Sequence, residues 1–180
     1  SYAFKPIIIY NVLQKINVPL IYMDCGCGFT NDTINGILNN LSKNYFYVSI
    51  SNNKNSIESR ELNHPDTLKH FGIKNTEIIS CLCGILGINY NNDATKNIIN
   101  EWYNYAMKQE IICPNGSNRN NHRQDLTVLS CILHNSKYNY SLNIKVPFSP
   151  WKNRGSNTYY NKYKPFSCFE KTTNKYESRI

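Results

Sequence analysis

The chain has 180 residues, which is long enough for one well-buried core, so a single domain is the default expectation. A hydrophobic content of 41% with 13% aromatic residues excludes an intrinsically disordered protein. No run reaches the roughly 18–20 apolar residues that a membrane helix needs. The net charge of +8 favours anionic partners such as nucleotide phosphates, nucleic acid or acidic glycans.

Helices and strands are predicted to alternate along the first part of the chain. Helical spacing of apolar residues after Pro6 predicts a first helix, which leads into a short strand at 20–23. After a glycine-containing turn, Thr30 or Asn31 can cap a second helix. The β-branched and aromatic residues at 46–50 predict the next strand.

The alternation continues after a polar loop. Asp66 can cap a short helix, and small residues at 83–88 predict a strand. Asp93 is predicted to cap the helix with the clearest periodicity, and Asp125 lies at the start of another. This order of elements predicts an α/β fold with a Rossmann-like, mainly parallel sheet flanked by helices.

The pattern changes near the end of the chain. We expect a core domain at 1–145, followed at 146–180 by an irregular extension rich in basic and aromatic residues. Interleaved bases and rings are typical of a surface that binds single-stranded nucleic acid. The same composition suits a tail that wraps the domain, buries its rings and leaves its lysines in solvent.

Seven cysteines, mostly within apolar stretches, indicate reduced thiols and a cytoplasmic protein. The pairs Cys25-x-Cys27 and Cys81-x-Cys83 allow a four-thiolate zinc site if the fold brings them together. Burial of cysteine as a small core residue is the commoner reading of such a pattern.

Asp24 is the first candidate functional residue. It follows a buried strand and precedes Gly26 and Gly28, whose conformational freedom permits a sharp turn and close approach to a ligand. Ligands of open α/β sheets bind outside the carboxyl ends of the strands, so a metal ion or a sugar nucleotide fits here. The alternative is an Asp that forms a turn by bonding to its own backbone.

Asp125 is the second candidate. An acid in the first turn of a helix complements the helix dipole, which is a structural explanation for it. His122 and Arg123 just before it are suited to bind phosphate, although a solvated polar loop explains them equally well.

Several segments in this order resemble GT-A-type glycosyltransferases of bacterial and large-virus polysaccharide clusters, and more distantly the glycogenin-type transferases. The resemblance covers roughly residues 5 to 135. The matching segments are Lys5-Pro6, Leu20-Ile21-Tyr22-Met23-Asp24-Cys25-Gly26, residues 68–73, residues 80–86, Glu101-Trp102, and His122-Arg123-Gln124-Asp125-Leu126-Thr127-Val128-Leu129-Ser130.

The resemblance implies a cytoplasmic enzyme of polysaccharide biosynthesis. It would transfer a sugar from a nucleoside-diphosphate sugar to a glycan or other acceptor, with Mn²⁺ or Mg²⁺ as cofactor. Asp24 would meet the metal and the diphosphate, and Asp125 would be the catalytic carboxylate that faces the reacting sugar. Whether the reaction inverts or retains the anomeric configuration is left open.

The resemblance also implies a set of substrate-binding residues. Cys83 and Gly84 match a loop of small residues that admits the donor or acceptor sugar. The remaining positions are Lys5 and Gly26 and the basic residues His122 and Arg123. The leaving diphosphate also needs positive charge, for which Lys152 and Arg154 of the extension are candidates.

Three departures from the family pattern are visible. Gly26 replaces a second carboxylate near Asp24, and Leu126 replaces a Gln. The family's first strand and loop, which hold the nucleotide base, have no counterpart before Lys5, so we expect either an absent N-terminal part or a degenerate domain. Two other functions stay open: a module that binds single-stranded nucleic acid, and a catalytically silent domain of a larger transferase.

Overall fold

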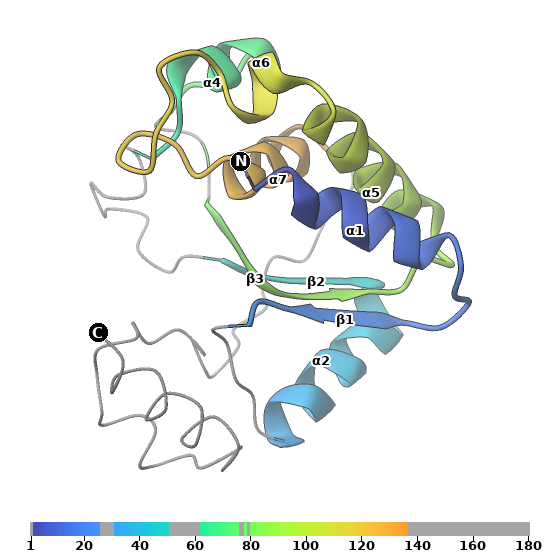
Figure 1. Ribbon diagram of the computed structural model, residues 1–180. Helices are drawn as coiled ribbons and strands as arrows, with labels where there is room; N and C mark the ends of the chain where they lie inside the picture. The colour runs from blue at the N-terminus through green and yellow to red at the C-terminus, as the bar shows by residue number, and fades with distance from the viewer. Residues whose placement is uncertain (1, 26–30, 51–61, 76–77, 79, 137–180) are drawn as a thin grey trace, which may run out of the picture.

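The computed structural model describes residues 2–25, 31–50, 62–75, 78 and 80–136 (Figure 1). Within them, helices and strands alternate as the sequence predicts up to the strand at 81–88, after which three helices follow one another. None of these helices is long and apolar enough to cross a membrane. The predicted extension at 146–180 lies outside the described residues. In chain order the elements are α1 (Phe4–Leu13), β1 (Leu20–Met23), α2 (Asn31–Asn44), β2 (Phe46–Ile50), α4 (Pro65–Phe71), β3 (Cys81–Ile88), α5 (Asp93–Ala106), α6 (Gln109–Ile112) and α7 (Asp125–Asn135).

The described strands form a three-stranded sheet in the order β1-β3-β2. Both outer strands are antiparallel to β3, with Met23 opposite Ile85 and Phe46 opposite Ile88. This corrects the expectation of a mainly parallel sheet. β1 and β2 do run in the same direction, but β3 lies between them and runs the other way. Alternation of helices and strands does not determine the direction in which a later strand enters the sheet.

Helices cover both faces of this sheet. α1, α5 and α7 lie on one face and α2 lies on the other (Figure 1). Successive side chains of β1 point to opposite faces of the sheet. Leu20 and Tyr22 pack toward α1, α5 and α7, and Ile21 and Met23 pack toward α2. The described part of the fold is therefore an α/β fold of three layers.

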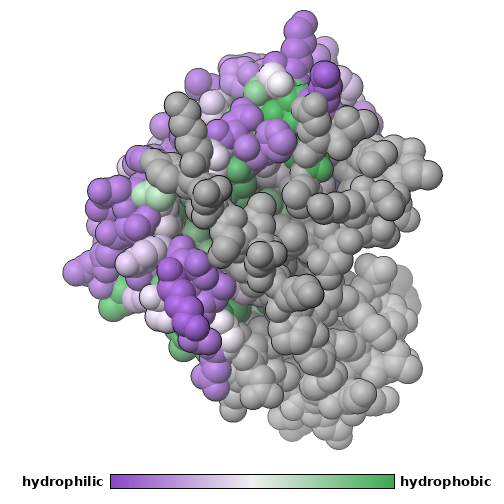
Figure 2. All heavy atoms as spheres, turned by 180° about the vertical axis from the view of Figure 1, so that it is seen from behind, coloured by the Kyte–Doolittle hydropathy of each residue, from purple (hydrophilic) through white to green (hydrophobic). Residues whose placement is uncertain are grey.

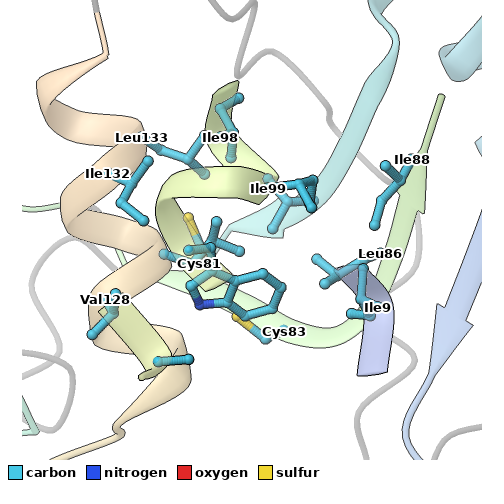
Figure 3. Packing of buried hydrophobic residues seen from close by; sticks show 14 of the residues in the cluster. Ile9, Cys81, Cys83, Leu86, Ile88, Ile98, Ile99, Val128, Ile132 and Leu133 are labelled. Atoms are coloured by element: carbon cyan, nitrogen blue, oxygen red, sulfur yellow. The ribbon is translucent and has the colours of Figure 1, made fainter. Parts of the chain in front are cut away.

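The main core lies between the sheet and α1, α5 and α7, around the fully buried Trp102. Figure 3 shows Cys81 and Cys83 pointing into this cluster. Burial raises the pKa of the Cys81 thiol to about 12, so it stays protonated at neutral pH. These two cysteines serve as small core side chains, as one of the two sequence interpretations predicts.

Two helix caps differ by one or two residues from the sequence prediction. The N-cap of α5 is Asn92, whose Oδ1 accepts from the backbone N–H groups of Ala94 and Thr95, and Asp93 lies in the first turn. The N-cap of α4 is His64, not Asp66. A cap needs extended backbone angles, which local sequence does not specify between neighbouring polar residues.

The face seen from behind is mainly hydrophilic where the described residues form it, with hydrophobic residues in small groups (Figure 2). The hydrophobic core clusters of the described chain lie on either side of the sheet.

Gly87 sets how closely α2 approaches the sheet. A Cβ at this position would lie 2.7 Å from Cγ2 of Ile37 and 3.0 Å from Cβ of Tyr47. We expect Gly87→Ala to lower the free energy of unfolding by about 1–3 kcal/mol, because the helix must shift away. Urea unfolding measures this change.

Gly36 is the matched control, because a Cβ there meets no atom within 4 Å. Gly36→Ala lies inside α2 and should stabilise the protein by roughly 0.5–1 kcal/mol through helix propensity. Equal stabilities of the wild type and Gly87→Ala would contradict the packing described for α2.

Candidate functional site

Lys5 is a buried cation in the first turn of α1, with an exposed fraction of 4%. Two features make this position unfavourable for a lysine by itself. A buried lysine is rare unless it is paired, and a positive charge near a helix N-terminus opposes the helix dipole. The structure must therefore hold this ammonium with partners of opposite charge.

Those partners are two acids that are far apart in the sequence. The Lys5 Nζ lies 3.2 Å from Oδ1 and 3.3 Å from Oδ2 of Asp24, and 3.0 Å from Oδ2 of Asp125. It also donates a hydrogen bond of 3.1 Å to the backbone oxygen of Cys83. We call these residues, together with Tyr22, the Lys5 cluster. It brings together both sequence-predicted acids.

β1 positions Asp24 by simple alternation. Tyr22 faces the main core, and Asp24, two residues later, faces the same side of the sheet. The Asp24 N–H donates to the Gly84 oxygen at 2.8 Å, which extends the ladder with β3 by one bond. The Tyr22 hydroxyl donates to Oδ1 of Asp24 at 2.8 Å. The side chain of Asp24 is 30% exposed, so this acid connects the cluster to solvent.

Tyr22 is a site residue that the sequence interpretation missed. Its ring centroid lies 5.6 Å from the Lys5 Nζ, close enough for a cation–π contact. Burial raises the pKa of its phenol, and the bond to Asp24 acts in the same direction, so Tyr22 remains a hydrogen-bond donor. The signal was present in the sequence: a Tyr two residues before the Asp shares its face of the strand.

An irregularity in β3 exposes the carbonyl that Lys5 uses. In the pairing with β2, Val48 lies opposite Leu86, but Ser49 lies opposite Leu82. The three residues between them, 83–85, have no counterpart on β2. Such bulges free backbone groups from the ladder, and here the freed carbonyl of Cys83 accepts from Lys5. Cys83 therefore contributes its backbone to the cluster, while its side chain packs in the core.

Asp125 is held by the backbone of α7. The Trp102 indole N–H donates to the Asp125 carbonyl at 3.0 Å, which fixes the start of α7 against α5. Ser130, one turn on, accepts from the Cys81 N–H at 2.8 Å and ties the same helix to β3. The Asp125 side chain is only 6% exposed, and its Oδ2 is an ion-pair partner of Lys5 that accepts no well-directed hydrogen bond from the described residues.

The charges of the cluster affect one another strongly. Burial raises the pKa of the Asp125 carboxyl, and the nearby Asp24 adds to this, while Lys5 acts against it. Burial opposes the charge on Lys5, but the two carboxylates more than compensate, so the pKa of Lys5 lies above its ordinary value. Lys5 is therefore protonated at neutral pH, and two ionised acids around it would leave one net negative charge.

The arrangement does not fit the divalent metal that the resemblance implies for Asp24. The Lys5 ammonium contacts both Asp24 oxygens and occupies the space between the two carboxylates. In the part of the chain that the structure describes, no three His, Cys, Asp or Glu residues gather as metal ligands. The arrangement also disfavours the four-thiolate zinc site, because Cys25 is exposed whereas Cys81 and Cys83 are buried. Cys27 lies outside the described residues.

The other predicted site residues lie in different settings. Gly84 contributes the carbonyl that bonds to Asp24. Arg123 is exposed, and its backbone N–H donates to the Leu62 oxygen at 2.9 Å. Three predicted residues, Gly26, Lys152 and Arg154, lie outside the described part of the chain.

His122 has a structural position. Its ring is 3% exposed, and its Nδ1 accepts from the His64 N–H at 3.2 Å. Its Nε2 therefore carries the proton and donates to the Ile112 oxygen at 3.1 Å. Burial lowers the pKa of His122 to about 4, and the His64 imidazole acts in the same direction. At neutral pH this imidazole is uncharged and joins the start of α4 to the end of α6.

The buried His122 predicts a pH-dependent stability. The unfolded chain takes up a proton near the ordinary pKa of about 6.5, and the folded chain does so only near pH 4. The free energy of unfolding should therefore fall by about 2 kcal/mol between pH 6.5 and pH 4. Urea unfolding across this range should show the fall in the wild type and a smaller fall in His122→Gln. His134→Gln, on the exposed end of α7, is the control and should leave the slope unchanged; an unchanged slope in His122→Gln would contradict the assignment.

Comparison with other proteins adds no independent identification. No protein-family model, curated protein or solved structure gives a significant match to the chain. The functional conclusion therefore depends on the geometry of the Lys5 cluster and on the motifs of the sequence.

Proposed function

We propose that this protein is a glycosyltransferase that moves a sugar from a nucleoside-diphosphate sugar to a glycan or other acceptor. The observation that carries the proposal is the meeting of Asp24 and Asp125 at one ammonium, beyond the carboxyl end of β1. The two acids lie 101 positions apart in the sequence, so their convergence is a property of the fold.

The chemistry of glycosyl transfer suits this arrangement. The bond between the anomeric carbon and the diphosphate oxygen breaks, and the diphosphate leaves with the electron pair. The acceptor oxygen forms the new bond to the anomeric carbon and loses its proton to a base or to solvent. Positive charge develops on the sugar ring in the transition state, and carboxylates stabilise that charge in glycoside hydrolysis. A site with one net negative charge favours the same charge development.

Different exposure supports different roles for the two acids. Asp24 is 30% exposed and is the acid that meets the incoming donor. Asp125 is 6% exposed and supplies the second carboxylate, facing the reacting sugar across Lys5. Burial raises the pKa of the Asp125 carboxyl, and a higher pKa makes its carboxylate a stronger proton acceptor. Tyr22 keeps Asp24 oriented through its hydroxyl.

The test is donor turnover by wild type and Asp24→Asn. The wild type should release UDP or GDP from a panel of nucleotide sugars, and Asp24→Asn should lower kcat by about 100-fold or more, as loss of a transition-state electrostatic partner does. Asp93→Asn is the matched control, because Asp93 is a highly exposed acid in the first turn of α5 and pairs with Lys96. It should retain full activity.

Two results would count against the transferase. One is a wild-type protein that neither turns over any nucleotide sugar nor gains thermal stability from UDP or GDP. The other is tight binding of single-stranded oligonucleotides that weakens steeply with salt, with turnover absent, which would favour the nucleic-acid module. Asp24→Asn should leave such oligonucleotide binding unchanged, because phosphate contacts come from basic residues.

A further inference from the structure

We infer that the Lys5 ammonium takes the position of a divalent cation in this site, so that the site works without a metal ion. The part of this inference that concerns donor binding rests on the proposed transferase function. The part that concerns cation occupancy stands on the geometry of the described residues alone.

The surroundings of the ammonium resemble the shell of a hard cation. Four oxygen atoms lie within 3.3 Å of the Lys5 Nζ: both carboxylate oxygens of Asp24, Oδ2 of Asp125 and the backbone oxygen of Cys83. Carboxylate and carbonyl oxygens are also the atoms that Mg²⁺ and Ca²⁺ select. The distances are those of N–H···O contacts, so the shell is sized for an ammonium group.

Charge excludes a metal ion beside this ammonium. A divalent cation between Asp24 and Asp125 would lie next to a buried positive charge that has nowhere to move, since Lys5 is 4% exposed. The Tyr22 hydroxyl lies outside this shell and holds the Asp24 carboxylate in place by donating to its Oδ1.

The inference makes a gain-of-binding prediction. Lys5→Ala removes the ammonium and leaves room for water and an ion between two carboxylates and a carbonyl. We expect Lys5→Ala to bind Mn²⁺ at least ten times more tightly than the wild type. Lys5→Met removes the charge but fills the space, so it is the matched control and should gain less.

Mn²⁺ titration followed by electron paramagnetic resonance measures this on the full chain without nucleotide. Thermal stability with Mn²⁺ and with EDTA gives a second readout. The gain in Lys5→Ala should disappear in the double variant Lys5→Ala/Asp24→Asn. A folded Lys5→Ala that gains no Mn²⁺ binding would overturn the inference.

A second comparison, between the wild type and Asp24→Asn, does not depend on whether Lys5→Ala folds. Mn²⁺ binding by the wild type that is lost in Asp24→Asn would overturn the inference, whereas the same weak binding in both proteins supports it. Nucleotide then separates this inference from the proposed function. Stabilisation by UDP or GDP that persists in EDTA supports both. Stabilisation that requires Mn²⁺ supports the transferase proposal and overturns the metal-free site. The absence of a response to any nucleotide contradicts the transferase proposal alone.

Discussion

The ion pairs of one buried lysine organise this protein. A charge removed from water is tolerated only when partners satisfy it, and Lys5 finds them on three other segments of the chain. α1 brings the ammonium, β1 brings Asp24, β3 brings a carbonyl and α7 brings Asp125. These elements pack around the same core, so the hydrophobic cluster places the backbones and the ammonium then holds the polar groups together.

Local patterns predict the elements of this fold well. The strands at 20–23 and 46–50 and the helices α2, α5 and α7 follow from hydrophobic periodicity, which depends only on near neighbours along the chain. The same reasoning places Asp24 at a strand end and Asp125 at a helix start. It fails on the direction of β3, because pairing between distant strands is decided by the whole sheet and by the long connection before β3.

The contacts within the site were harder to predict. The carbonyl of Cys83 enters the site only because β3 is irregular, and a backbone group carries no sequence signal. The setting of His122 was not predicted either: a basic residue beside a motif acid suggests phosphate binding, whereas the structure buries this imidazole and gives it two hydrogen bonds. Lys5 was predicted to bind substrate directly, but its partners are the acids predicted to do so.

The irregular stretch of β3 also has a consequence for how this sequence can vary. Before it, Cys81 and Cys83 face the main core; after it, Leu86 and Ile88 do, so the inward positions change from odd to even numbers. A deletion or insertion of one residue there would move the side chains of one half of the strand to the opposite face of the sheet. Cys83 is buried in the main core and Ile85 in the cluster against α2, so the length of the segment 83–85 is fixed by the two layers that it connects.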